Sequence, residues 1–166
     1  RWYITLDFNY AIASWSPLLL LALFSLTPVV VVAANDSVVT RQIHGDFFDV
    51  ANDIRAAIIG KGINIAHDLP ASDMLKRTGP AYCYQTNTYD NARTFEFCSA
   101  RISHKLARQN PDNIVLCPFT ISVYSITNEP GIVRVSYRIP VGLPGSEAII
   151  KEIITLISDI IEDASW

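Results

Sequence analysis

The sequence predicts an α+β fold, a compact antiparallel sheet with helices packed on one face, preceded by a single N-terminal transmembrane helix. Three observations lead to this prediction. Residues 17–34 contain no charged side chain, residues 114–139 contain two segments of alternating apolar and polar residues, and residues 46–60 and 146–161 repeat apolar residues at helical spacing. Alternation is typical of half-buried strands, and spacing by three and four residues is typical of amphipathic helices.

The apolar run at residues 17–34 is long enough to span a bilayer. At about 1.5 Å of rise per residue, it covers about 27 Å of the ~30 Å hydrocarbon core. We expect a bend near residues 24–28, because Pro28 lacks a backbone N–H. A signal peptide is one alternative, because small residues precede a polar stretch at 35–37, and a buried core helix is another. The residues expected to anchor the chain are Trp15, Pro17, Leu20, Phe24, Pro28 and Val32.

The residues around this run predict its orientation. Residues 1–16 form an interfacial aromatic lead-in, since tryptophan and tyrosine rings settle at the headgroup level of a membrane. Arg1 favours the cytoplasmic side under the positive-inside rule. We therefore expect a single-pass protein of a bacterial inner membrane, with its N-terminus in the cytoplasm and residues 35–166 forming a periplasmic domain.

Strands and helices alternate through the first half of this domain. Asp46 stands at an N-cap position, and apolar residues then recur at helical spacing until Gly60. Pro70 ends a short strand, and the Gly79-Pro80 pair ends a helical turn. The expected strands cover residues 38–44, 63–69, 81–88 and 93–98, with a turn at 89–91, and the expected helices cover 46–60 and 71–78.

The second half predicts a helix, a hairpin and a helix. Ser99 is expected to cap a helix with Ile102, Leu106 and Ala107 facing inward. The odd positions from residue 115 to 123 are apolar and predict a strand that begins at residue 114. A turn at 128–131 leads to a strand at 133–139. Ser146 is then expected to cap a final helix with the apolar stripe Ile149, Ile150, Ile153, Leu156, Ile157, Ile160 and Ile161.

The three cysteines, Cys83, Cys98 and Cys117, cannot all pair within one chain. Cys98 and Cys117 flank a predicted helix, and three arrangements stay open: a disulfide, two buried thiols, and metal or haem ligation with His104. On the predicted strand Cys117 has the parity of the apolar residues, whereas Cys98 faces away from the phenylalanines that precede it. We therefore expect two unbonded thiols, with Cys117 buried in the core, and no bound metal or cofactor.

Two cysteine-containing motifs resemble a known family. They are Phe97-Cys98-Ser99, and Leu116-Cys117-Pro118 followed by the alternating segment FTISVY. In these motifs, in the early helix and in the isoleucine-rich end, residues 38–163 resemble the domain of unknown function 302 family. The resemblance implies a compact α+β fold, often paired into homodimers, and no established activity.

The composition and the absence of catalytic motifs argue against two classes of function, nucleic-acid binding and catalysis. A net charge of −3 and a pI near 5.5 provide no basic field for nucleic acid. The sequence contains no nucleophile elbow, Walker loop or dinucleotide-binding glycine motif, so we expect no catalytic residues and no enzyme. Arg134 and Arg138 share one face of a strand, where we expect them to keep an exposed sheet face soluble rather than to clamp an anion.

These observations favour a non-catalytic, membrane-anchored accessory subunit of a larger membrane complex, respiratory or photosynthetic. Its partners would be the lipid bilayer and integral membrane subunits, and its domain would brace a partner on the periplasmic side. One alternative is a periplasmic redox or metal/haem-binding protein that uses Cys98, Cys117 and His104. Another is a binding protein that holds a small apolar or anionic ligand between sheet and helix.

Overall fold

The structure is a computed structural model that describes residues 37–164. The predicted aromatic lead-in, the predicted transmembrane helix and its bend near Pro28 lie outside these residues. Among the helices of residues 37–164, none combines the length and the apolar character needed to cross a membrane.

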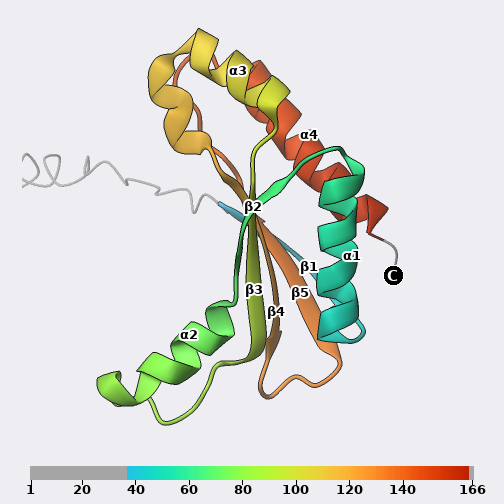
Figure 1. Ribbon diagram of the computed structural model, residues 1–166, viewed down its shortest axis with the longest axis vertical. Helices are drawn as coiled ribbons and strands as arrows, with labels where there is room; N and C mark the ends of the chain where they lie inside the picture. Colours follow the sequence, from blue (N-terminus) through green and yellow to red (C-terminus); the bar gives the residue numbers. More distant parts are fainter. Residues whose placement is uncertain (1–36, 165–166) are drawn as a thin grey trace, which may run out of the picture. The chain divides into compact units, whose positions relative to one another are not determined.

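The described domain is an α+β fold built on one antiparallel sheet, as predicted (Figure 1). The strand order across the sheet is β1-β5-β4-β3-β2. The strands are β1 (Val38–His44), β2 (Ile65–Leu69), β3 (Tyr89–Phe97), β4 (Phe119–Ile126) and β5 (Ile132–Arg138). The α-helices are α1 (Phe47–Gly60), α2 (Ala71–Thr78), α3 (Ala100–Gln109) and α4 (Glu147–Asp163), and the 3₁₀-helices are η2 (Gly79–Tyr82) and η3 (Pro111–Leu116).

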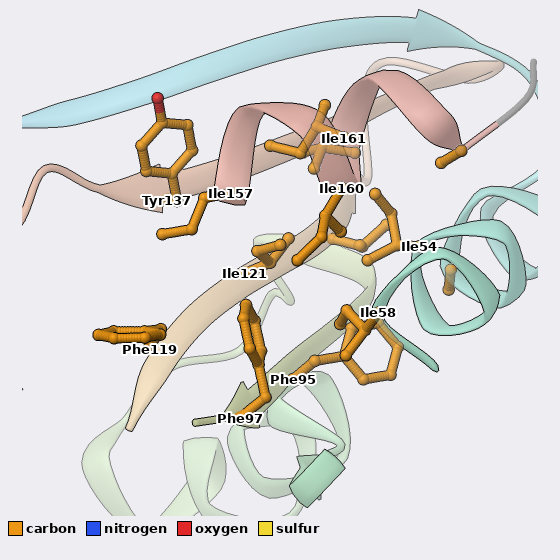
Figure 2. Packing of buried hydrophobic residues seen from close by; sticks show 14 of the residues in the cluster. Ile54, Ile58, Phe95, Phe97, Phe119, Ile121, Tyr137, Ile157, Ile160 and Ile161 are labelled. Carbon is orange, nitrogen blue, oxygen red and sulfur yellow. The ribbon is translucent and has the colours of Figure 1, made fainter. Parts of the chain in front are cut away.

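The core lies between the sheet and helices α1 and α4. Phe95 and Phe97 of β3 and the buried odd-numbered residues of β4 and β5 point to this side, because strand side chains alternate between the two faces. Figure 2 shows Phe95, Ile121 and Tyr137 from the sheet facing the isoleucines of the two helices. The fully buried isoleucines are Ile54 and Ile58 of α1, Ile102 of α3, Ile121 of β4, and Ile153 and Ile160 of α4, each 0 % exposed.

Helix α1 begins and ends where its sequence predicts. The Asp46 carboxylate accepts hydrogen bonds from the backbone N–H groups of Phe48 (2.7 Å) and Asp49 (3.2 Å), which satisfies two donors of the first turn. After the helix, Gly62 takes a positive φ of 72° that suits glycine. Lys61 Nζ lies 2.6 Å from Asp163 Oδ2 at the end of α4, and this hydrogen bond raises the pKa of Lys61.

Two predicted strand segments are wrong. Residues 81–88 are not a strand, because Gly79-Pro80 opens η2 and Cys83 follows in the left-handed region at φ 63°. The expected turn at 89–91 instead begins β3, where Tyr89 pairs with Ile126. Residues 114–118 are not part of a strand either, because Pro111 opens η3 and β4 begins only at Phe119.

Helix α3 and η3 are held to α4 by polar contacts. The buried Asn113 side chain donates to the Leu106 carbonyl (3.2 Å) and to Ser146 Oγ (2.9 Å), and it accepts from the Leu143 N–H at 3.2 Å. Ser146 therefore uses its hydroxyl in this contact and makes no side-chain cap bond. Lys105 Nζ lies 2.8 Å from Glu152 Oε2, and the hydrogen bond from Lys105 lowers the pKa of Glu152. Ala107, which was expected to face inward, is exposed on α3.

Neighbouring isoleucines on α1 provide a matched test of this core. Ile58 is 0 % exposed and Ile59 is 53 % exposed. We expect Ile58→Ala to lower the free energy of unfolding by about 2–5 kcal/mol, because it removes buried contacts and leaves a cavity. Ile59→Ala should change it by no more than about 0.5 kcal/mol. Urea unfolding followed by circular dichroism measures both; equal losses would contradict the assignment of the buried face.

Candidate functional site

Cys98 and Cys117 form a disulfide, so the expectation of two unbonded thiols is wrong. Their Cα atoms are 6.0 Å apart, within the range that a disulfide needs. The alternation of β4 does not extend back to Cys117, because the residues before it form η3, so strand parity does not set the direction of its side chain. Cys117 lies between η3 and β4 and is half-buried rather than enclosed in the core.

The disulfide closes the segment that contains α3 and η3. Phe97 and Phe119 are paired across β3 and β4, so the chain leaves the sheet after one and returns to it just before the other. Cys98 directly follows Phe97, and Cys117 lies two positions before Phe119. The two cysteines are 19 positions apart. Closing a loop of this length stabilises a domain by about 3 kcal/mol in the chain-entropy model. Persistent disulfides of this kind are typical of oxidising compartments such as the bacterial periplasm.

The predicted metal candidates do not come together as a ligand set. Cys98 and Cys117 are bonded to each other, so neither sulfur is available as a thiolate ligand. His104 is exposed on α3. Within residues 37–164, no group of three or more histidine, cysteine or acidic side chains has a geometry suited to a metal ion.

The two arginines that were predicted on one face of a strand, Arg134 and Arg138, have different surroundings. Arg134, whose side chain is 14 % exposed, pairs with Glu129 through Nη2, while its Nη1 is buried with no hydrogen-bond partner. Around it, the face opposite the core carries hydroxyl pairs, Thr40 with Ser136 and Thr94 with Ser122, each at 2.8 Å. Arg138 lies exposed at the end of β5. The two arginines therefore lie in different environments and do not form a shared clamp.

A cavity of about 390 Å³ lies between α2, η2 and the start of β3. Figure 1 shows α2 across the sheet from α1. Ser72 fixes α2 to the sheet, since its hydroxyl donates to the Ala92 carbonyl at 3.5 Å. The chain then turns back at η2, where the Tyr84 N–H donates to the Gly79 carbonyl at 3.0 Å. The cavity is lined by Ser72, Met74, Leu75, Lys76, Thr78, Gly79, Tyr82, Tyr84, Thr86, Asn87, Thr88 and Tyr89.

The lining combines tyrosine, methionine and leucine side chains with hydroxyl and amide groups and one ammonium group. Tyr82 and Tyr84 are 71 % and 72 % exposed, unusually high for large aromatic residues. Tyr89 is oriented by an edge-on contact with Tyr124, with ring centroids 5.5 Å apart. Lys76 Nζ donates to the Asp90 carbonyl at 2.7 Å, which uses one of its three N–H donors. This arrangement offers ring faces, apolar contact and a positive charge to a bound molecule.

Our sequence reasoning missed this cavity. It assigned residues 81–88 to a strand and treated residues 89–91 only as a turn. The available signal was three tyrosines, Tyr82, Tyr84 and Tyr89, close behind the Gly79-Pro80 pair. Such a pair predicts irregular backbone, and aromatic residues on irregular backbone often serve binding.

The fold and the site define a small, disulfide-bonded α+β domain with a pocket between its sheet and the segment formed by α2 and η2. The family model for Domain of unknown function DUF302 matches residues 39–164, so the chain belongs to the DUF302 family. The crystal structure of an uncharacterized conserved DUF302 protein from Bacillus stearothermophilus is similar, with a TM-score of 0.65 and 12% sequence identity. The match covers 78% of this chain and 99% of that protein, and at this identity it supports the fold alone. A comparison with curated proteins found no match.

The disulfide predicts the number of reactive thiols. Denatured, unreduced protein should contain one reactive thiol per chain, at Cys83, which is the free cysteine of the structure. Reduction should raise this number to three, the cysteine content of the sequence. Ellman's reagent in guanidinium measures it, with Cys83→Ser as the control that removes the unreduced signal. Three thiols before reduction would contradict the disulfide.

Proposed function

We propose that this protein is a membrane-anchored, non-catalytic binding protein whose pocket between α2 and β3 holds a small, mainly apolar aromatic molecule. The observation that carries this proposal is the pocket itself. Its volume of about 390 Å³ lies within the range of small-molecule sites, which are concave, mostly apolar and provided with few polar groups. Most of the exposed pocket surface is apolar, although its lining also includes hydroxyl and amide side chains, and Lys76 contributes one positive charge.

The lining supports a specific ligand chemistry. Planar rings stack well on tyrosine, and Met74 adapts its shape to an apolar partner. Lys76 keeps two N–H donors after its bond to Asp90, and an ammonium pairs favourably with a carboxylate. The ligand class proposed is therefore an aromatic carboxylate.

The proposed membrane anchor rests on the sequence, and the proposed oxidising location rests on the disulfide. The uncharged run at residues 17–34 supports a single-pass anchor. The bond between Cys98 and Cys117 supports an oxidising location, as in the periplasm of a bacterial inner-membrane protein.

The accessory subunit of a membrane complex is the second candidate function. The exposed Tyr82 and Tyr84 favour it, because tyrosine is enriched in protein interfaces. In this case the protein migrates with integral membrane partners on native electrophoresis in mild detergent. Migration as a single chain or as a homodimer would rule out this second candidate and leave the first intact.

Met74 provides a direct test of the pocket, because it is the only methionine of the sequence and lines the cavity. With [¹³C-methyl]methionine label in the full chain in nanodiscs, titration with 2-naphthoate should shift the methyl signal of Met74. We expect Leu75→Glu to weaken this binding about tenfold, the effect of losing roughly 1.4 kcal/mol of apolar contact.

The matched control is Ile59→Glu on α1. Ile59 is 53 % exposed and Leu75 is 44 % exposed, so both changes place a carboxylate on a partly exposed apolar site. Ile59→Glu should bind 2-naphthoate like the unmodified chain. A Met74 signal that 2-naphthoate leaves unmoved, or that moves equally in Leu75→Glu, would refute the proposed site.

A further inference from the structure

We propose that the domain rests on the bilayer through an apolar tip formed by Val38, Ile114, Val115 and Val141, with lipid as the partner of this surface. The proposal rests on the membrane-anchor part of the proposed function. These four residues are 53 %, 66 %, 81 % and 82 % exposed, respectively. Val115 and Val141 are the most exposed large apolar residues of the described chain.

The tip residues come from three segments that meet at one end of the domain. Val38 begins β1 and pairs with Arg138 at the end of β5. The Ile139 N–H donates to the Ser37 carbonyl at 2.8 Å, which extends this contact by one residue. Arg138 and Pro140 also line a small cavity of about 140 Å³ together with Val115 and Leu116 of η3. Val141 follows Pro140, so the start of β1, η3 and the loop after β5 lie together.

If residues 17–34 form a membrane span, the short connection after them limits how far this end of the domain can lie from the membrane. Only residues 35–37 separate the apolar run at 17–34 from β1. An extended chain advances at most about 3.3–3.6 Å per residue, so β1 starts within roughly 14 Å of the end of that run. If residues 17–34 span the bilayer, this limit keeps the side chains beside Val38 within reach of the headgroup layer.

The chemistry of the tip fits a lipid surface. Valine and isoleucine side chains gain about 25 cal/mol per Å² of apolar area that they remove from water. Arg138, beside the tip, can extend its guanidinium to lipid phosphates while its aliphatic part stays among the apolar residues. Asp112, the acidic residue in the first turn of η3, is exposed. Its charge limits insertion to the interface and keeps η3 out of the hydrocarbon core.

This orientation leaves the ligand pocket accessible. In Figure 1, α2 lies at one end of the domain, and α3 with the gold segment after it lies at the other. A domain that rests on the bilayer through η3 therefore points α2 and its pocket away from the membrane. A soluble aromatic ligand would reach the pocket from the aqueous side.

The test places one environment-sensitive fluorophore at either end of the domain. The full chain is reconstituted in nanodiscs of phosphatidylcholine and phosphatidylglycerol, and NBD is attached at Val115→Cys in a Cys83→Ser background. The matched control carries NBD on the native, exposed Cys83 beside the pocket. The disulfide-bonded cysteines are not labelled without reductant. A Val141→Cys label in the same background tests a second tip position.

We expect the tip labels to emit at shorter wavelength and to be quenched severalfold more strongly by doxyl-labelled lipid than the Cys83 label. Val115→Asp should weaken the quenching at Val141→Cys, whereas Ile59→Asp should leave it unchanged. Tip labels that behave like the Cys83 label, while the protein stays in the nanodisc, would overturn this proposal alone. A protein that fails to remain with the nanodisc would overturn the membrane anchor and, with it, this proposal.

Discussion

Side chains alternate between the two faces of the sheet, and this constraint determines where every other part of the domain lies. Phe95, Ile121 and Val135 all point to one side, and α1 and α4 cover that side with isoleucines. The even-numbered positions are left with hydroxyl groups and with the Arg134–Glu129 pair, which do not form an apolar core. Helix α2 touches the sheet mainly along β3, through Ser72, so the space between α2, η2 and β3 is only partly filled. The candidate pocket thus arises because this helix lies across the sheet from the main core.

The Cys98–Cys117 bond has a second, local effect on the architecture. It joins the two points at which the chain leaves and re-enters the sheet, so that α3 and η3 form a closed segment beside α4. Asn113 and the Lys105–Glu152 pair then fix this segment to α4 from the inside and from the surface. A 3₁₀-helix held in this way presents Ile114 and Val115 to the outside, because its short turn cannot bury every side chain. The disulfide and two residues of the apolar tip, Ile114 and Val115, therefore belong to one closed segment.

The sequence predicts the regular elements of this domain well, because their patterns are long and their boundaries have chemical markers. Asp46 and the isoleucine stripe of α4 are examples, and the family resemblance is confirmed. Errors occur at two 3₁₀-helices that contain a proline in their first turn: after Pro80 and Pro111 the sequence was assigned to strands, the second of them because of its alternation. The wrong strand at residues 114–118 also led to the wrong expectation for the cysteines, because the direction of a side chain depends on the element that contains it. The pocket was missed because its lining comes from an irregular segment whose position against β3 is set by tertiary contacts.

The central claim is that the domain is a disulfide-bonded binding module held on the outer side of a cytoplasmic membrane. Cys83 tests it most directly, because this free cysteine is exposed beside the pocket. The measurement is the labelling of Cys83 by a membrane-impermeant maleimide in bacterial spheroplasts that express the full chain, compared with lysed cells. The account predicts equal labelling before and after lysis, at Cys83 alone. Labelling that occurs only after lysis would place the domain in the cytoplasm and contradict the account.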